Sequence, residues 1–244
     1  FISILGFGTI FDKYTNIYEN SLKTEGLTFI QGLFLISIIS ILINFIFPLN
    51  IFVTTSIILI GIVLFVFFFL QNNKKKQKIK FILIVSLLSY VYAYYSGVHD
   101  DYSYHYNTIL NFNEKNIFQI THDRNISYNS NWLFISSIFY INSISSTLFI
   151  LGSLLYSIFI FDTYKIYNKS LKEKSYYSAL VSFFALIFFL GVINKYKEIG
   201  TDFPGVILSF YTLILIVKYK LENKINGNNL FLISFLLFSF AFVI

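Results

Sequence analysis

The chain has 244 residues, of which 56% are hydrophobic, 21% aromatic and only 12% charged, with a formal net charge of +6. This composition is too apolar for a soluble domain of that length, so most side chains are expected to face lipid or other helices. Cysteine is absent, which excludes disulfides, thiolate nucleophiles and metal sites that need cysteine. The positive charges fall in short clusters between apolar segments, a pattern typical of membrane topology that does not indicate a nucleic-acid partner.

The N-terminal third contains a predicted helical hairpin. An apolar segment, Phe1 to Phe11, stops at a charged pair and is either the tail of a span or an amphipathic lead-in. Two apolar segments, Leu27 to Phe47 and Ile51 to Leu70, flank a short turn with Pro48, and each is long enough to cross a bilayer as a helix. The segment from Lys74 to Lys80 follows, and the positive-inside rule assigns it to the cytoplasm.

Beyond these lysines the same rule predicts alternating spans and loops. The predicted crossings are Phe81 to Ser96, Ile144 to Phe161, Tyr177 to Ile193 and Pro204 to Val217. The outer side holds a long segment, Gly97 to Asn131, a short one, Asn194 to Phe203, and the apolar half-helix Trp132 to Ile141, which is expected at the membrane interface. From residue 71 onward the inner loops carry 12 lysines against three acids, Asp162, Glu173 and Glu222, whereas the outer segments carry four basic residues against six acids. The charge asymmetry therefore agrees with every predicted crossing.

These elements predict an all-α fold, namely a polytopic transmembrane helix bundle with a long outer loop that carries short interfacial helices. Residues 1–244 form one predicted transmembrane domain, and residues 97–131 are the outer loop with the acidic motif. Methionine is absent, also at position 1, and the chain ends within an apolar run, so we expect a fragment cut at both ends. The predicted location is the cytoplasmic (inner) membrane, which the chain crosses several times.

Two adjacent acids in the long outer segment are the first candidates for chemistry. Asp100 and Asp101 directly follow a predicted span, at the membrane surface where the phosphate of a lipid-linked substrate would lie. A carboxylate there can act as a general base or hold a divalent cation, whereas the simpler interpretation is a pair of solvated acids. If the next residues are helical, Asp101 and His105 share one helix face, which suits a metal ion or a hydrogen-bonded pair.

Basic residues of the outer segments are candidates for binding a phosphate. Arg124 is the only arginine among the 18 basic residues, and its planar guanidinium suits a phosphate better than lysine does. Its alternative role is to pair with Asp123 or Asp101 and order the loop. The short outer segment contributes Lys195 and Lys197.

The short outer segment also contains two acids, Glu198 and Asp202. Thr201 or Asp202 is expected to cap the helix that follows, with Pro204 in its first turn. Capping leaves either acid able to face the same cavity as Asp101. We therefore expect the two outer segments to converge.

This arrangement resembles the GT-C superfamily of integral-membrane glycosyltransferases, which includes protein O-mannosyltransferases, oligosaccharyltransferases and aminoarabinose transferases. The resemblance rests on an outward-going helix followed by the run His99-Asp100-Asp101-Tyr102-Ser103-Tyr104-His105, then a long loop, an apolar half-helix and a returning span. It covers about Phe81 to Val217. The chain departs from the better-known members in having two or three spans, instead of one, before the acidic loop, as in bacterial surface-polysaccharide membrane proteins.

The resemblance implies a catalytic or metal-binding role for Asp101 or Asp100 and a second acidic role for Asp202 or Glu198. The implied activity is transfer of a sugar from a polyprenyl-phosphate carrier to a glycan, lipid or protein on the outer face of the cytoplasmic membrane. The expected partners are the lipid bilayer and the polyprenyl-phosphate sugar, and a divalent cation is the candidate cofactor. The residues expected to bind substrate are His105, His122, Arg124, Lys195, Lys197, Glu198 and Asp202. Two alternatives stay open: a polysaccharide polymerase or O-antigen ligase, and a non-catalytic transporter or assembly subunit.

Overall fold

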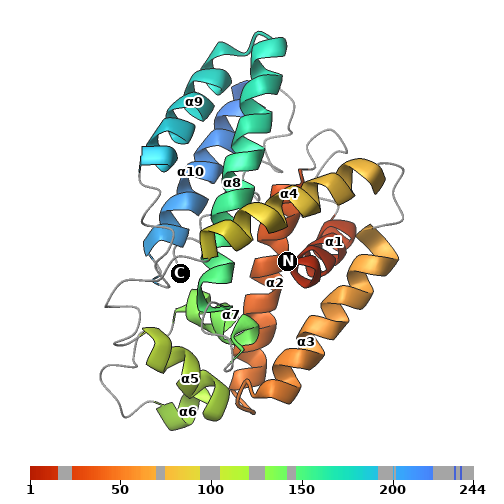
Figure 1. Cartoon of the computed structure of the whole chain (residues 1–244), viewed down its shortest axis with the longest axis vertical. Helices are drawn as coiled ribbons and strands as arrows, with labels where there is room; N and C mark the ends of the chain where they lie inside the picture. Colours follow the sequence, from red (N-terminus) through yellow and green to blue (C-terminus); the bar gives the residue numbers. More distant parts are fainter. Residues whose placement is uncertain are drawn as a thin grey trace.

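The computed structural model of the chain describes residues 1–15, 24–69, 75–93, 105–120, 130–141, 147–191, 200, 202–221, 234 and 237. Within these residues every element is a helix, which confirms the all-α prediction for them. In chain order the elements are α1 (Ile2–Thr15), α2 (Glu25–Asn44), α3 (Ile51–Leu64), the π-helix η1 (Phe65–Phe69), α4 (Lys75–Ala93), α5 (Tyr106–Glu114), α6 (Ile117–Ile120), α7 (Asn131–Phe139), α8 (Thr147–Lys172), α9 (Tyr176–Gly191) and α10 (Asp202–Leu221). Figure 1 shows α8, α9 and α10 together in the upper part, and α5, α6 and α7 below, beside the joined ends of α2 and α3.

The predicted hairpin is present as α2 and α3, and each helix begins at a capping residue. The hydroxyl of Thr24 accepts a hydrogen bond from the backbone N–H of Leu27 at 3.1 Å. The side chain of Asn50 accepts one from the N–H of Val53 at 3.2 Å. These bonds satisfy N–H groups that a helix start leaves without partners inside the helix. Pro48 lies in the turn between the two helices, where its missing N–H costs no helical hydrogen bond.

Helix α1 packs between α2 and α3 at glycines. A Cβ atom on Gly6 would lie 1.9 Å from the carbonyl oxygen of Gly61 on α3, and one on Gly8 would lie 1.8 Å from that of Thr28 on α2. Gly32 on α2 approaches the backbone of α1 in the same way. Small residues of this kind let helix backbones pack in close contact. The first residues therefore form a helix that is packed into the bundle.

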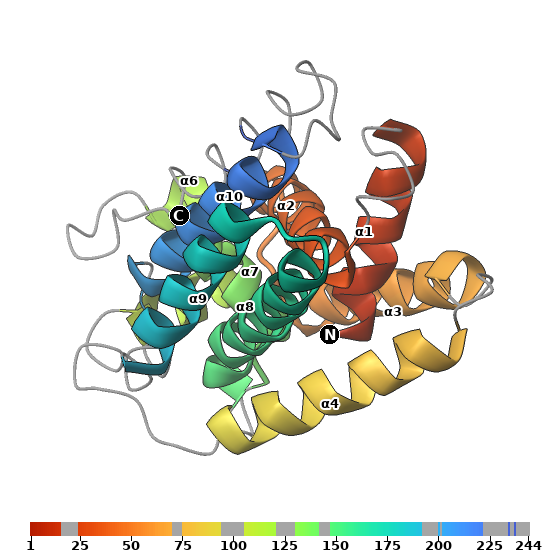
Figure 2. The same cartoon turned by 90° about the horizontal axis from the view of Figure 1, so that it is seen from above.

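Helix α4 lies across the other long helices. Its buried side chains recur at every fourth position, at Phe81, Val85, Ser89 and Ala93, whereas Leu83 and Leu87 on the opposite side are 64% and 66% exposed. The stripe packs on α8. Ridges with a four-residue spacing cross a neighbouring helix at roughly 50°. Figures 1 and 2 both show α4, which contains most of the predicted crossing Phe81 to Ser96, running at a steep angle to α8.

Two predicted elements differ from the helices that form. The predicted crossing Ile144 to Phe161 corresponds to α8, which continues to Lys172 and takes in residues assigned above to an inner loop. The predicted half-helix Trp132 to Ile141 forms as the short helix α7. Every residue of α7 from Trp132 to Ile138 is buried, because α7 packs among α2, α5 and α8. Its apolar character therefore comes from the protein interior and not from exposure at an interface.

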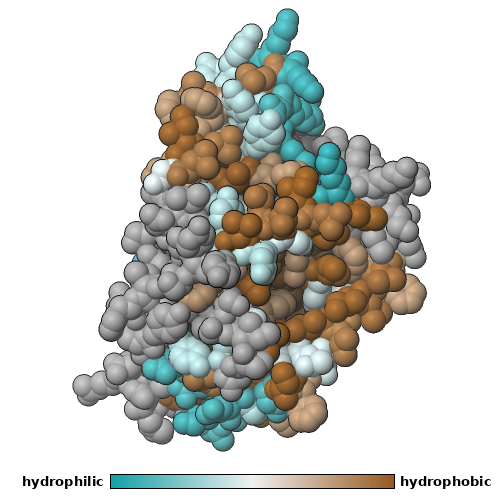
Figure 3. All heavy atoms as spheres, viewed as in Figure 1, coloured by the Kyte–Doolittle hydropathy of each residue, from teal (hydrophilic) through white to brown (hydrophobic). Residues whose placement is uncertain are grey.

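Three of the described helices are long and apolar enough to cross a membrane, namely Glu25–Asn44, Ile51–Phe68 and Phe149–Lys172. Large apolar side chains also cover the outside of the molecule: Phe52 on α3 is 81% exposed and Phe184 on α9 is 60% exposed. In Figure 3 hydrophilic residues gather at the top and bottom of the molecule, with hydrophobic residues between them. An apolar surface between two polar ends is the expected form of a protein that has lipid as its solvent.

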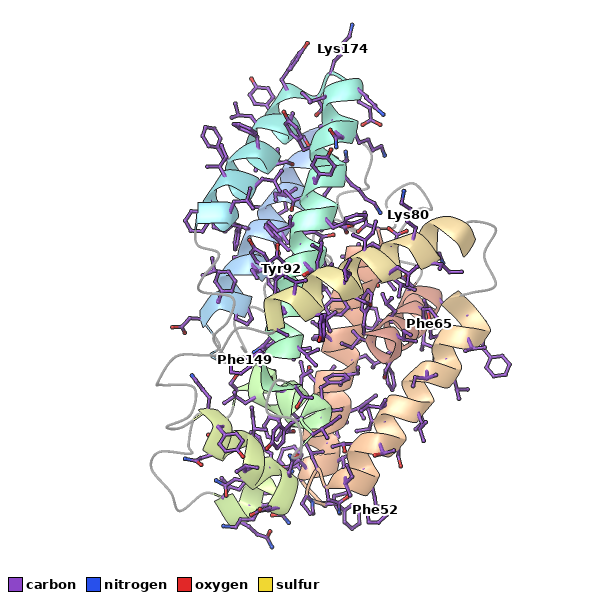
Figure 4. All side chains as sticks on the ribbon, in the orientation of Figure 1. Phe52, Phe65, Lys80, Tyr92, Phe149 and Lys174 are labelled. Atoms are coloured by element: carbon purple, nitrogen blue, oxygen red, sulfur yellow. The ribbon has the colours of Figure 1, made fainter. Side chains whose placement is uncertain are left out.

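Two terms describe the ends of this bundle. The lysine end is the end at which α2 begins, where Lys165 donates to Glu25 and lies beside the ring of Phe81, the residue after Lys80. The turn end is the opposite end, where α2 and α3 are joined. In Figure 4 Lys80 and Lys174 lie in the upper part of the molecule and Phe52 lies at the bottom, at the turn end.

Candidate functional site

Two of the predicted site residues, His105 and Asp202, lie within the part of the chain that the structure describes. The other predicted site residues lie outside it: Asp100, Asp101, His122, Arg124, Lys195, Lys197 and Glu198. His105 directly precedes α5 and Asp202 is the first residue of α10. His105 is the last residue of the acidic run, and Asp202 lies within the short outer segment.

His105 packs against Gly200. A Cβ atom on Gly200 would lie 3.2 Å from Nε2 of His105 and 3.9 Å from the two ring carbons beside it. The imidazole is 7% exposed, and it makes no capping hydrogen bond to α5 although His105 is the N-cap residue. The long and the short outer segments therefore meet where their described residues begin. In the sequence His105 follows Asp101 by four positions and Gly200 follows Glu198 by two.

Helix α5 is fixed to the turn end by hydrogen bonds that its backbone accepts. The N–H of Leu49 donates to the carbonyl oxygen of Phe112 at 2.8 Å, and the amide of Asn44 donates to the same oxygen at 3.3 Å. The ring of Phe112 stacks on that of Phe134 of α7 at 3.8 Å between centroids. The last turn of α5 is thereby held on the turn end and on α7.

A tyrosine pair lies next to His105. The hydroxyls of Tyr106 and Tyr140 are 3.0 Å apart and share a hydrogen bond, and the rings meet edge to face. Burial, together with the hydrogen bond to Tyr106, raises the pKa of Tyr140 above the usual range of a phenol. The hydroxyl of Tyr140 is therefore neutral at physiological pH, and it shares its hydrogen bond with Tyr106. The two tyrosines join the start of α5 to the end of α7.

The start of α10 is anchored by aromatic packing. Phe203 stacks on Tyr156 of α8, with 6.2 Å between ring centroids, and contacts Phe189 of α9 at 5.8 Å. Tyr92, near the end of α4, meets Tyr156 edge to face at 5.4 Å. Asp202, in contrast, is exposed in the first turn of α10. The ends of α4, α9 and α10 that lead into the outer segments thus share one aromatic cluster.

At the corner where His105 meets Gly200, the groups available for chemistry are side-chain oxygens and an imidazole. Pro204 lies in the first turn of α10, as predicted, and a carboxylate at Asp202 interacts favourably with the positive end of the helix dipole. Among the described residues no group of three or more His, Asp or Glu side chains is placed to hold a metal ion. The acids at positions 100, 101 and 198 lie outside these residues.

The structure reveals a second polar centre, at Asp162 on α8, that the sequence analysis assigned to an inner loop. This side chain is fully buried, and its Oδ2 accepts hydrogen bonds from the N–H of Gly26 at 2.9 Å and from the hydroxyl of Tyr211 at 2.8 Å. The hydroxyls of Tyr211 and Thr24 are 3.0 Å apart. Its Oδ1 is buried without a hydrogen-bond partner among the described residues.

This centre joins three helices that are distant in the sequence. Gly26 lies in the first turn of α2, so the carboxylate of Asp162 caps α2 from outside that helix. A Cβ atom at Gly26 would lie 2.1 Å from Oδ2 of Asp162, which explains the glycine. The local signal that could have revealed the site is the apolar periodicity of α8, which continues past Phe161 to the buried Ile166.

Residues 1–244 match the protein family described as Domain of unknown function (DUF8201), and the chain belongs to that family. The match includes every described helix. No curated protein matches the chain. No solved structure matches it either.

Proposed function

We propose that this DUF8201 domain is a multi-pass membrane glycosyltransferase that takes a sugar from a polyprenyl-phosphate carrier on the outer face of the cytoplasmic membrane. The observation that carries the proposal is the contact between His105 and Gly200. It supports a single site at which the acidic run and the short outer segment meet. Acids and bases must both reach the lipid phosphate for transfer, and at such a site Asp101 and Arg124 of the long segment would join Lys195 and Lys197 of the short one.

The bundle suits a membrane location in two respects. Three helices are long and apolar enough to cross a bilayer, and the intervening surface exposes large apolar side chains. Lys165 and Lys169 lie exposed on α8 beyond the level at which α2 begins, whereas His105 lies at the start of α5, which is bonded to the α2–α3 turn. By the positive-inside rule the lysine end faces the cytoplasm, and the corner at His105 faces away from it.

The proposed roles follow from charge and position. Asp101, or its neighbour Asp100, removes the proton of the acceptor hydroxyl or holds a divalent cation that neutralises the leaving phosphate. Arg124, with Lys195 or Lys197, binds that phosphate through charge-assisted hydrogen bonds. His105 is buried against Gly200, so its role is to position the two segments and not to contact the sugar.

The test is transfer from a radiolabelled polyprenyl-phosphate sugar in membranes that contain the full-length protein. Asp101→Asn keeps the size of the side chain and removes its charge, so transfer should fall by about 10² to 10⁴, the usual contribution of a positioned acid or base. Asp123→Asn is the control and should have a smaller effect, because Asp123 is expected only to orient Arg124. Normal transfer by both Asp100→Asn and Asp101→Asn, at normal protein level, would overturn the proposal.

The buried carboxylate of Asp162 raises transport as an alternative function. A transporter is expected to have its polar groups near the middle of the membrane, where two half-helices meet. Asp162 instead bonds to the first turn of α2, at one end of that helix, and its Oδ2 is occupied by Gly26 and Tyr211. This arrangement favours a structural role for Asp162 and leaves the outer corner as the better candidate site.

A further inference from the structure

Two lysines at the lysine end are held against aromatic rings. The ammonium group of Lys165 on α8 lies 4.5 Å from the ring centre of Phe161 and 5.1 Å from that of Phe81. The ammonium group of Lys13 on α1 lies 4.7 Å from the ring centre of Phe68. A cation over a ring face is attracted by the quadrupole of the ring and loses part of its hydration. Both charges are therefore held at defined positions along the bundle.

These positions coincide with helix ends. Lys165 donates at 3.1 Å to Glu25, the first residue of α2. The carboxylate of Asp12, the residue before Lys13, accepts a hydrogen bond at 3.3 Å from Thr28, which lies one turn further along α2. The ring that Lys13 contacts is that of Phe68, the last residue of the span Ile51–Phe68. Each ammonium group thus lies where a helix long enough to cross a membrane begins or ends.

Positive charge exceeds negative charge around these two positions. The exposed lysines of this part of the molecule are Lys13, Lys80, Lys165, Lys169, Lys172 and Lys174. The described acids of this part are fewer than its lysines: they are Asp12 and Asp162, which are buried, and Glu25 and Glu173, which pair with Lys165 and Lys169. Clusters of four or more lysines beside a membrane span attract anionic lipid headgroups.

We propose that Lys13 and Lys165 each bind the phosphate of an anionic phospholipid in the adjacent leaflet. The phosphodiester of a phospholipid lies at the height at which the hydrocarbon-spanning helices end, which is where the two ammonium groups are held. Each ammonium group is partly desolvated by its ring, and a phosphate oxygen binds it on the side that faces away from the ring, in the case of Lys165 beside its bond to Glu25. A zwitterionic lipid carries its own cation next to the phosphate, and this cation competes with the lysine. The site therefore selects net negative headgroups such as phosphatidylglycerol.

This inference rests on a membrane location but not on transferase activity, and its test uses no sugar. The purified full chain in detergent is titrated with phosphatidylglycerol or phosphatidylcholine, and bound lipid is counted by native mass spectrometry. A lysine near an anionic surface contributes about 1 kcal/mol, which corresponds to about fivefold in affinity. Lys13→Gln and Lys165→Gln should each weaken phosphatidylglycerol binding about fivefold, and the double variant about 25-fold.

Two control variants separate ring-held lysines from general charge. Lys174→Gln removes an exposed lysine at the α8–α9 turn, and Lys115→Gln removes one at the turn end; both should bind phosphatidylglycerol within about twofold of the unchanged protein. Lys165→Arg keeps the charge and the ring contact and should retain binding. Equal affinity of the unchanged protein for the two lipids, or an effect of Lys174→Gln as large as that of Lys165→Gln, would overturn the proposal.

A measurement on the unchanged protein guards against variants that fail to fold. Raising the salt concentration from 0.15 to 1 M shortens the Debye length from about 8 to about 3 Å, which screens contacts between exposed charges. Binding of phosphatidylglycerol should then weaken at least tenfold towards the value for phosphatidylcholine, because the two sites together contribute about 25-fold. Binding that does not depend on salt would also overturn the proposal.

Discussion

Nε2 of His105 lies 3.2 Å from the point that a Cβ atom of Gly200 would occupy. That spacing is tighter than an ordinary van der Waals contact, so a methyl group there would displace the imidazole by a few tenths of an ångström and a larger side chain by more. Gly200 is therefore the residue at which the spacing of the two outer segments can be changed without altering any charged group.

Gly200→Val should lower sugar transfer by up to about 100-fold, because a shift of roughly 1 Å in the position of catalytic groups has an effect of that size. Gly191→Val is the matched control, since nothing lies within 4 Å of a Cβ atom at Gly191. The measurement is transfer per mole of folded protein in membranes. Equal transfer by the two valine variants would show that the contact with His105 does not position the site.

Tyr211→Phe should lower the free energy of unfolding by about 1 to 3 kcal/mol, because it removes one of the two hydrogen bonds to the buried Oδ2 of Asp162. Tyr177→Phe, at a tyrosine that is 75% exposed, should change it by less than about 0.5 kcal/mol. Thermal unfolding in detergent, followed by circular dichroism, compares the two. A Tyr211→Phe protein as stable as the Tyr177→Phe protein would mean that the bond contributes nothing to the fold.

Gly8→Ala should destabilise the bundle by about 1 to 3 kcal/mol or prevent folding, because the added methyl group would lie 1.8 Å from a backbone oxygen of α2. A backbone atom cannot move aside as a flexible side chain can, so α1 would have to separate from α2. Gly191→Ala is the control and should be neutral or slightly stabilising, because an alanine near a helix end has less chain entropy to lose. Similar stability of both alanine variants would contradict the close packing of α1.

The two ends of the bundle should be accessible from opposite sides of the membrane. The chain has no cysteine, so Lys80→Cys and Lys115→Cys each introduce a single thiol at an exposed position. In intact cells a membrane-impermeant thiol reagent should label Lys115→Cys, at the turn end, and not Lys80→Cys. Both should be labelled after the cells are opened. The reverse pattern would place the corner at His105 in the cytoplasm. It would then contradict the proposal that the sugar donor is bound on the outer face of the membrane.

The helical hairpin was predictable because its signals are local. Two apolar runs of sufficient length and a turn with Pro48 determine α2 and α3 wherever the rest of the chain lies. The direction of α4 was not predictable in the same way. Its sequence is apolar on every side after Lys80, so the pattern does not reveal that one four-residue stripe packs on α8 while the opposite side stays exposed.

The sequence identified the segments of the candidate site as a prediction, but it did not predict the contacts of the described residues. Asp162 was assigned to a loop because an acid after an apolar run usually marks the end of a span, whereas the buried bonds to Gly26 and Tyr211 keep it inside α8. The contact between His105 and Gly200 joins residues that are far apart in the chain, and no local pattern records such a pairing. The convergence of the acids themselves stays a prediction.

The bond between Gly26 and Asp162 links residues that are 136 positions apart, and this separation has a consequence for biosynthesis. A ribosome adds about 5 to 20 residues per second, so the first turn of α2 emerges on the order of ten seconds before the carboxylate that completes its cap. During that interval the N–H of Gly26 has no partner from α8. The new chain must therefore keep the start of α2 near water, or in contact with the insertion machinery, until α8 has been made.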